Sequence, residues 1–156
     1  MKSYIQIKNK ILKFDKVIKV SGDKSISIRC VLLASQAIGK SKIYNLLESE
    51  DVINSLDSIK KLGIKVKKYK DFYEIHGFGI NGYNTKKKLT INAGNSGTLA
   101  RLILGLLVDS KNEIKLVGDK SLSKRDFSRV TDPLKLFGAN IISNKNNLPL
   151  KIIKEE

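Results

Sequence analysis

The sequence lacks tryptophan, has a single cysteine and two prolines, and only 6% of its 156 residues are aromatic. The single cysteine, Cys30, excludes an internal disulfide bond and a zinc site built from several cysteines. No apolar run has the length of a membrane-spanning helix, and the first residues lack the apolar core of a signal peptide. Since 41% of the residues are nonetheless hydrophobic, we expect a globular protein of the cytoplasm with one domain or two small lobes.

Acidic residues are also scarce, because 15 Asp and Glu face 30 Lys and Arg and leave a net charge of +15. A charge of this size is one feature of nucleic-acid-binding proteins. The lysines, however, are spread along the chain in ones and twos, and the few aromatic residues provide few surfaces on which bases could stack. We therefore interpret the charge as a solvated coat that also attracts anionic substrates, and this pattern argues against nucleic acid as a partner.

The spacing of apolar residues predicts alternating strands and helices in the first half of the chain. Residues 4–8 and 17–20 are predicted strands. Residues 27–38 are predicted to form a helix that ends at Gly39 and is buried, because almost every side of it is apolar. The remaining predicted elements are a strand, a helix and the two strands of a hairpin: residues 41–46, 48–62, 64–68 and 72–75.

The same order recurs in the second half of the chain. The predicted strands and helices there are residues 89–91, 98–107, 113–117, 126–137, 139–143 and 148–153. Gly63 and Gly138, which end corresponding helices, are 75 positions apart. Because a constant offset indicates an internal repeat, we assign one βαβαββ unit to residues 20–80 and a second to residues 88–154.

Each unit has a glycine turn that leads into an apolar helix, and both turns are candidate anion sites. Backbone N–H groups are free at a helix start, where the helix dipole is positive. In the first unit Lys24 adds a charge, and Ser25 and Arg29 lie four residues apart on one helix face. In the second unit Gly97 lets a ligand approach the backbone, and the loop before the next helix supplies Arg125.

If the two units stack in parallel, Lys24, Gly97 and Arg125 converge on one anionic ligand. The alternative is that each turn is an ordinary capped helix start with surface cations. The sequence alone leaves both interpretations open.

Three segments closely resemble the N-terminal motifs of the EPSP synthase (3-phosphoshikimate 1-carboxyvinyltransferase) family, in the same order and spacing: residues 22–29, 95–101 and 118–125. The resemblance spans essentially the whole chain. It implies an α+β fold of tandem βαβαββ units, the enolpyruvyl transferase prism with buried helices and outer mixed sheets. It also implies transfer of the enolpyruvyl group of phosphoenolpyruvate to the 5-hydroxyl of shikimate 3-phosphate, on the route to chorismate and aromatic amino acids, without a metal or redox cofactor.

The resemblance assigns roles to individual residues. Lys24 would contact both substrates and is the candidate catalytic residue, for proton transfer or charge stabilisation. Ser25 and Arg29 would hold shikimate 3-phosphate, and the Arg29 fork suits its carboxylate. Gly97 and Arg125 would hold phosphoenolpyruvate, with Arg125 on its phosphate. The supporting residues of this pocket would be Asn95, Thr98 and Arg101.

The length departs from that family, in which a third unit completes this domain and a second domain supplies acidic proton-transfer residues. We therefore expect residues 1–156 to be the N-terminal part of an enolpyruvyl transferase: a fragment, a truncation or one chain of a split enzyme. Such a chain would be inactive alone and would need the C-terminal part as a continuation or as a separate chain.

Three alternatives remain. The UDP-N-acetylglucosamine enolpyruvyl transferase family has Lys-Asn at the position of Lys24 and Ser25, and a reactive cysteine in the loop that here holds Lys120 and Ser121, whereas Cys30 is predicted to be a core residue. A non-catalytic remnant or subunit that needs a partner chain is the second alternative. A basic RNA-binding module on the same fold is the third.

Overall fold

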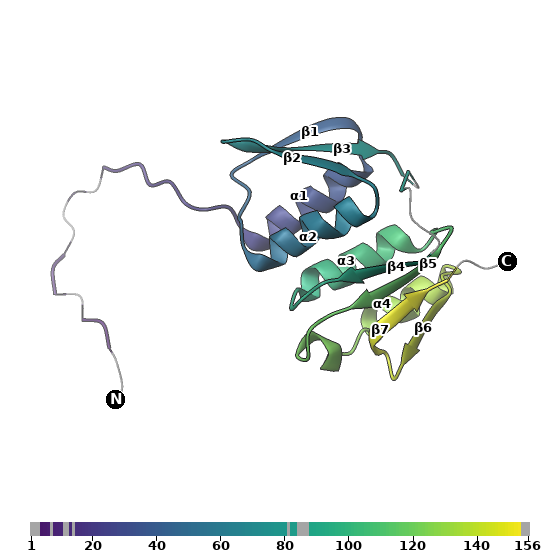
Figure 1. Ribbon diagram of the computed structural model, residues 1–156. Helices are drawn as coiled ribbons and strands as arrows, with labels where there is room; N and C mark the ends of the chain where they lie inside the picture. Colours follow the sequence, from purple (N-terminus) through teal and green to yellow (C-terminus); the bar gives the residue numbers. More distant parts are fainter. Residues whose placement is uncertain are drawn as a thin grey trace.

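The computed structural model describes residues 4–6, 8–10, 13, 15–80, 82–83 and 88–153. Figure 1 shows two halves, each a sheet packed on helices, with α3 lying between the helices of the first half and the sheet of the second. The first half consists of α1 (Lys24–Gln36), β1 (Ile38–Tyr44), α2 (Glu50–Lys61), β2 (Lys65–Lys68) and β3 (Phe72–Phe78). The second half consists of β4 (Lys88–Asn92), α3 (Gly97–Leu107), β5 (Glu113–Val117), the 3-10 turn η1 (Leu122–Lys124), α4 (Ser128–Leu136), β6 (Ile141–Asn144) and β7 (Asn147–Ile152).

The two sheets differ in their strand directions. The first has the order β1-β3-β2 and is antiparallel throughout. The second has the order β4-β5-β7-β6, in which β4 and β5 are parallel and the other pairs antiparallel. The parallel pair follows from the chain path, because α3 forms the crossover between β4 and β5.

The apolar core lies between the sheets and the helices. Its fully buried members include Ile28 and Val31 of α1, Ile59 of α2, and Ile103 and Leu107 of α3. Burial of a side chain of this size stabilises the fold by about 1.5–3 kcal/mol. Helices α1 and α3 each bury one side in this core, and both contact α2.

Every helix and strand that the sequence predicts between residues 41 and 153 is present, with ends that differ by a few residues. Gly63 and Gly138 follow α2 and α4 with φ angles of 91° and 89°, as a glycine that ends a helix requires. The second half has the predicted order of strand, helix, strand, helix and two strands.

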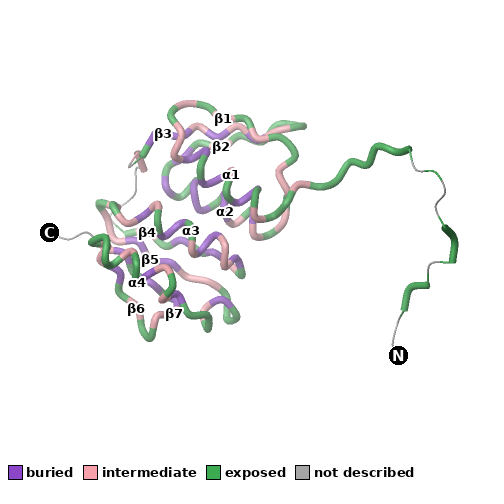
Figure 2. Tube along the Cα trace, turned by 180° about the vertical axis from the view of Figure 1, so that it is seen from behind, coloured by how far each residue is buried: buried purple, intermediate pink, exposed green. Residues whose placement is uncertain are grey.

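The predicted strands before residue 21 are wrong where the structure describes them. Residues 17–20 are extended but form no strand, and Val17 is 96% exposed. Residues 4–6 and 8 are not in a strand either, and Ile7 lies outside the described residues. Figure 2 shows this segment running away from the body of the molecule. Apolar alternation becomes a strand only beside another strand, and no described strand lies next to this segment.

Helix α1 differs from its prediction in three ways. It begins at Lys24 and ends at Gln36, so Gly39 lies within β1, with a φ of 89°, rather than at the helix end. It is buried on one side only, because Ile26 and Leu33 are exposed. The predicted core residue Cys30 is accordingly only half-buried.

Candidate functional site

Helices α1, α2 and α3 begin at the same end of the molecule, as Figure 1 shows from the direction of their colours. Asp23 caps α1, since its Oδ1 accepts a hydrogen bond of 2.8 Å from the Ile26 N–H. Ser96 caps α3 in the same way, with 3.2 Å between the Leu99 nitrogen and Ser96 Oγ. The arrangement gathers the positive ends of three helix dipoles, as the parallel stacking of the two units predicts.

Gly22 is needed for packing at the start of α1. A β-carbon on Gly22 would collide with the carbonyl oxygen of Asn45, just after β1. The turn therefore lies directly against the end of the strand, and this contact fixes where Lys24 enters the helix.

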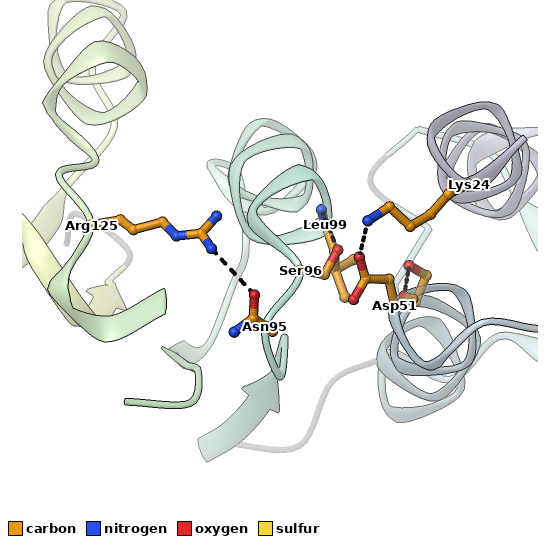
Figure 3. A network of polar contacts seen from close by, with 7 residues as sticks. Lys24, Asp51, Asn95, Ser96, Leu99 and Arg125 are labelled. Carbon is orange, nitrogen blue, oxygen red and sulfur yellow. Dashed lines mark hydrogen bonds and ion pairs between the residues drawn. The ribbon is translucent and has the colours of Figure 1, made fainter. Parts of the chain in front are cut away.

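Lys24 is paired with an acid that the sequence analysis did not connect to it. Its Nζ lies 2.9 Å from Oδ2 of Asp51, in the first turn of α2 (Figure 3). Lys24 is half-exposed, whereas Asp51 is mostly covered. Asp51 thus holds the lysine toward the loop before α3. The acid at the start of α2 is visible in the sequence, but its pairing needs the packing of α1 on α2.

Gly97 lies against two guanidinium groups. A β-carbon on this residue would lie 2.7 Å from Nη1 of Arg101 and 3.0 Å from Nη1 of Arg125. Arg101 is fixed by hydrogen bonds of 3.3 Å to the carbonyl oxygens of Gly97 and Asp126, and it lies over the Phe127 ring at 5.0 Å. Only a residue without a side chain leaves room here for an anion to reach both guanidinium groups.

Arg125 is oriented by a chain of two further side chains. Its Nη2 donates a 3.2 Å hydrogen bond to Oδ1 of Asn95, and Nδ2 of Asn95 donates one of 2.6 Å to Oδ2 of Asp119. A carboxylate only accepts hydrogen bonds, so Asp119 turns the amide oxygen of Asn95 toward Arg125. Figure 3 shows Arg125 and Lys24 reaching from opposite sides toward the loop that holds Asn95 and Ser96.

The pKa values of two acids in the loop between β5 and α4 are lowered. The Leu122 N–H, 2.7 Å from Oδ1, is the largest cause for Asp119, and the Asn95 amide adds to it, so the pKa of Asp119 lies below its usual value. The Ser128 N–H lowers the pKa of Asp126 in the same way. Both carboxylates are therefore ionised at neutral pH and hold the loop rather than exchange protons.

The remaining predicted site residues are less closely gathered. Ser25 and Thr98 are half-buried in the first turns of α1 and α3. Arg29 lies one turn further along α1, at an apolar groove lined by leucines: Leu32, Leu33, Leu102 and Leu106. Within the described part of the chain the Arg29 guanidinium has no hydrogen-bond or ion-pair partner, so it is free to bind an anion.

Two buried polar groups near the start of α2 were not predicted from the sequence. Ser49 Oγ and Asn54 Nδ2 are buried, and neither has a hydrogen-bond partner among the residues that the structure describes. A β-carbon on Gly94, in the loop before α3, would collide with Nδ2 of Asn54. Asn54 therefore packs directly under the loop that carries Asn95.

The described residues contain no group of three or more His, Cys, Asp or Glu side chains that could hold a metal ion. They also include no helix with the length and apolarity needed to cross a bilayer.

Comparison with known proteins gives a consistent result. Residues 8–156 match the model of the EPSP synthase (3-phosphoshikimate 1-carboxyvinyltransferase) family. A 3-phosphoshikimate 1-carboxyvinyltransferase of Ruthia magnifica subsp. Calyptogena magnifica is 48% identical over 136 residues, which are 86% of this chain and 31% of the relative. The enzyme of that name from Streptococcus mutans is 43% identical over 133 residues, 85% of this chain and 31% of the relative.

The fold agrees with that comparison. The structure of EPSP synthase from Acinetobacter baumannii superposes with a TM-score of 0.80 at 34% sequence identity, over 87% of this chain and 31% of that one. The predicted fold class, an α+β fold of the enolpyruvyl transferase prism that is incomplete relative to the family, is thereby confirmed. The chain spans about a third of the length of the relatives it matches.

Proposed function

This chain belongs to the EPSP synthase family, and we propose that it carries the N-terminal part of a site for phosphoenolpyruvate and shikimate 3-phosphate. The complete site would transfer the enolpyruvyl group to the 5-hydroxyl of shikimate 3-phosphate and release phosphate. The observation that carries the proposal is the position of Gly97 at the start of α3, where a β-carbon would lie within 3.0 Å of two guanidinium groups.

The second unit would bind phosphoenolpyruvate. Arg125 would pair with the phosphate, and the absence of a side chain on Gly97 would let that phosphate approach the first N–H groups of α3. Arg101 would add charge while its bonds to two backbone carbonyls keep it in place. Asn95 and Thr98 would support the pocket from the loop and from the first helical turn.

The first unit would bind shikimate 3-phosphate. Ser25 and Arg29 would hold the shikimate moiety, with the unpaired Arg29 fork on its carboxylate. Lys24 would lie between the two ligands, because Asp51 draws its ammonium group toward the loop before α3. That position makes Lys24 the candidate catalytic residue.

In the reaction the 5-hydroxyl of shikimate 3-phosphate gives up its proton as its oxygen bonds to C2 of phosphoenolpyruvate, and C3 takes up a proton, giving a tetrahedral intermediate. The C2–O bond to phosphate then breaks and C3 gives up a proton, which restores the double bond. Lys24 and Arg125 would stabilise the phosphate and the developing charge in a site closed to water. The acidic proton-transfer groups and the second wall of the site would come from the two thirds of the family's length outside this chain, so we propose that the chain is inactive alone.

A second candidate is a non-catalytic subunit that associates with a partner chain. The apolar groove beside Arg29 favours association, since Leu33 and Leu102 of its lining are exposed to solvent in this chain. A single sharp monomer peak in size-exclusion chromatography at high protein concentration would argue against it.

Isothermal titration calorimetry with phosphoenolpyruvate and with shikimate 3-phosphate tests the proposal. We expect weak binding of at least one substrate, loss of that binding in Lys24→Ala, and unchanged binding in Lys135→Ala, a matched change in the last turn of α4. No binding by the unmodified chain would contradict the proposal. An assay of phosphate release from both substrates tests the second part, and clear turnover would contradict the expected inactivity.

A further inference from the structure

The first sheet has one face covered by helices and one face open to solvent. Helices α1 and α2 pack against one side only (Figure 1), and the buried side chains Tyr73 and Ile75 of β3 point to that side. Side chains alternate along each strand, so the intervening residues of β1, β2 and β3 lie on the open face. These are Ile38, Lys40, Lys42, Tyr44, Lys65, Lys67, Phe72, Glu74, His76 and Phe78.

The strand register orders this open face into rows. Lys40 lies beside His76, which lies beside Lys65. The next row is Lys42, Glu74 and Lys67, and the row after it pairs Tyr44 with Phe72. Four lysines therefore lie close together although they are scattered in the sequence. The only acid among the ten residues of this face is Glu74, which is 3.7 Å from the Lys40 ammonium group.

Aromatic side chains gather at one end of the open face. The Tyr44 and Phe72 rings have centroids 5.3 Å apart, and Tyr69, in the turn between β2 and β3, stacks on Phe72 at 4.6 Å with an interplanar angle of 16°. Lys42 Nζ lies 5.1 Å from the centre of the Phe72 ring. Tyr44 is 62% exposed and Tyr69 43%, so this cluster presents ring surface to solvent.

A second aromatic contact lies at the other end of the same face. The His76 and Phe78 rings are 5.5 Å apart, and Phe78 is exposed. Ile38 and Tyr44, the two ends of β1, are six positions apart, which corresponds to about 20 Å of strand. Of the ten Tyr and Phe residues of the chain, four lie on or beside this one face: Tyr44, Tyr69, Phe72 and Phe78.

We propose that the open face of the β1-β3-β2 sheet binds single-stranded nucleic acid, with bases stacked on the Tyr44, Phe72 and Tyr69 cluster and phosphates bound by the four lysines. Stacking on exposed rings beside lysine is a general way to hold single strands without reading their sequence. The small number of aromatic residues in the sequence argues against such a partner. The fold, however, places four of them on or beside this one face. An acidic peptide or an anionic membrane would use the lysines and leave the stacked rings without a role.

This inference is independent of the enolpyruvyl transfer site, because the open face lies on the side of the sheet away from α1 and α2. Binding is measured by fluorescence anisotropy of labelled uridine and thymidine oligonucleotides of about 20 nucleotides, with a duplex of the same length for comparison. We expect both single strands to bind more tightly than the duplex and to weaken as salt rises. A difference in affinity between the uridine and the thymidine oligonucleotide shows whether RNA or DNA is the natural ligand.

Variants locate the binding on the molecule. Tyr44→Ala combined with Tyr69→Ala should weaken binding roughly tenfold or more, the loss of one or two stacked bases. Lys42→Glu should also weaken binding, whereas the charge-matched change Lys135→Glu on α4 should have much less effect. Phe137→Ala removes an exposed ring far from the sheet and should change nothing.

Four results would overturn the inference. They are no binding at low salt, equal affinity for the duplex, equal losses in the control variants, and competition by phosphatidylserine vesicles as strong as by unlabelled oligonucleotide. If the tyrosine variant does not fold, cross-linking of the unmodified chain to a 4-thiouridine oligonucleotide decides the question. Cross-links must then map to Tyr44, Tyr69 or Phe72, and cross-links confined to the lysine-rich residues 8–20 would contradict the assignment.

Discussion

The ammonium group of Lys24 lies 2.9 Å from Oδ2 of Asp51, so the cation that opens α1 is held by the acid that opens α2. The pair joins two helix starts that are 27 positions apart in the sequence. It also places a negative charge directly beside a site that we propose to bind anions. Asp51 therefore orients Lys24, and its negative charge at the same time repels an anionic ligand.

Replacing Asp51 with Asn separates these two effects. Asn keeps an oxygen that can accept a hydrogen bond from Lys24 but removes the charge, so we expect the affinity for phosphoenolpyruvate to rise about two- to fivefold. The loss of an acid from the first turn of α2 should lower the free energy of unfolding by about 0.3–1 kcal/mol. Calorimetry and urea unfolding measure the two quantities.

The matched control for Asp51 is Asp57→Asn, in the same helix. Asp57 is exposed and pairs with Lys60 at 3.0 Å, away from the helix start. We expect the control to leave the affinity unchanged. An equal rise in both variants would mean that only the net charge of the chain matters.

Gly97→Ala tests the contact between the start of α3 and the two guanidinium groups. The new methyl group would lie within 3.0 Å of Arg101 and Arg125, whose flexible ends must move away from the helix start. Because at least one charge-assisted hydrogen bond to a bound phosphate is then lost, we expect about tenfold weaker binding of phosphoenolpyruvate with little change in stability. Titration calorimetry measures the loss.

Gly105→Ala is the control on the same helix. Nothing lies within 4 Å of a β-carbon there, and alanine favours a helix over glycine by about 1 kcal/mol. This variant should be more stable and should bind as the unmodified chain does. Weaker binding in Gly105→Ala would show that α3 as a whole, and not the space at Gly97, determines the affinity.

The lowered pKa of Asp119 makes the loop before α4 sensitive to acid. A carboxylate whose pKa is lower in the folded than in the unfolded state stabilises the fold fully above the unfolded value of about 3.9. That stabilisation is lost as the pH falls through the lower folded value, because Asp119 then takes up a proton. We expect the free energy of unfolding to fall as the pH drops below about 4, and to fall less in Asp119→Asn than in the unmodified chain.

Asp119→Asn should also weaken binding at neutral pH. Asn can present an N–H to Nδ2 of Asn95, and the resulting clash would rotate the Asn95 amide and release Arg125. The control is Asp71→Asn in the turn between β2 and β3, which is exposed and far from the loop. If the free energy of unfolding falls equally at acid pH with and without Asp119→Asn, the stabilisation by the Asp119 carboxylate is contradicted.

Much of the fold could be predicted because it depends on local signals. Apolar periodicity located the helices and strands from residue 41 onward, and Gly63 and Gly138 marked two helix ends through their φ angles. Residues 17–20 are also mostly apolar, yet they form no strand, because a strand exists only through its neighbour. An apolar pattern indicates that a segment can form a strand, but it does not show whether a neighbouring strand is present.

The site was predictable in its residues but not in its contacts. Lys24, Gly97 and Arg125 stand out through glycine turns, charge and family resemblance. Asp51 and Asp119 do not, because their importance comes from ion pairs and hydrogen bonds across 27 and 24 positions of sequence. Such partners follow from the packing of one helix start on another, which composition and spacing do not contain.

Two neighbouring leucines test the finding that α1 is buried on one side only. Leu32 is 3% exposed and Leu33 68%, so Leu32→Ala should lower the free energy of unfolding by about 2–5 kcal/mol and Leu33→Ala by less than about 0.5 kcal/mol. Urea unfolding of both variants measures the difference, and the two changes remove the same atoms from adjacent positions. If Leu33→Ala is as damaging as Leu32→Ala, the exposed side of α1 must be covered in solution. Because only another copy of the chain is present in that sample, the loss should then shrink as the protein is diluted.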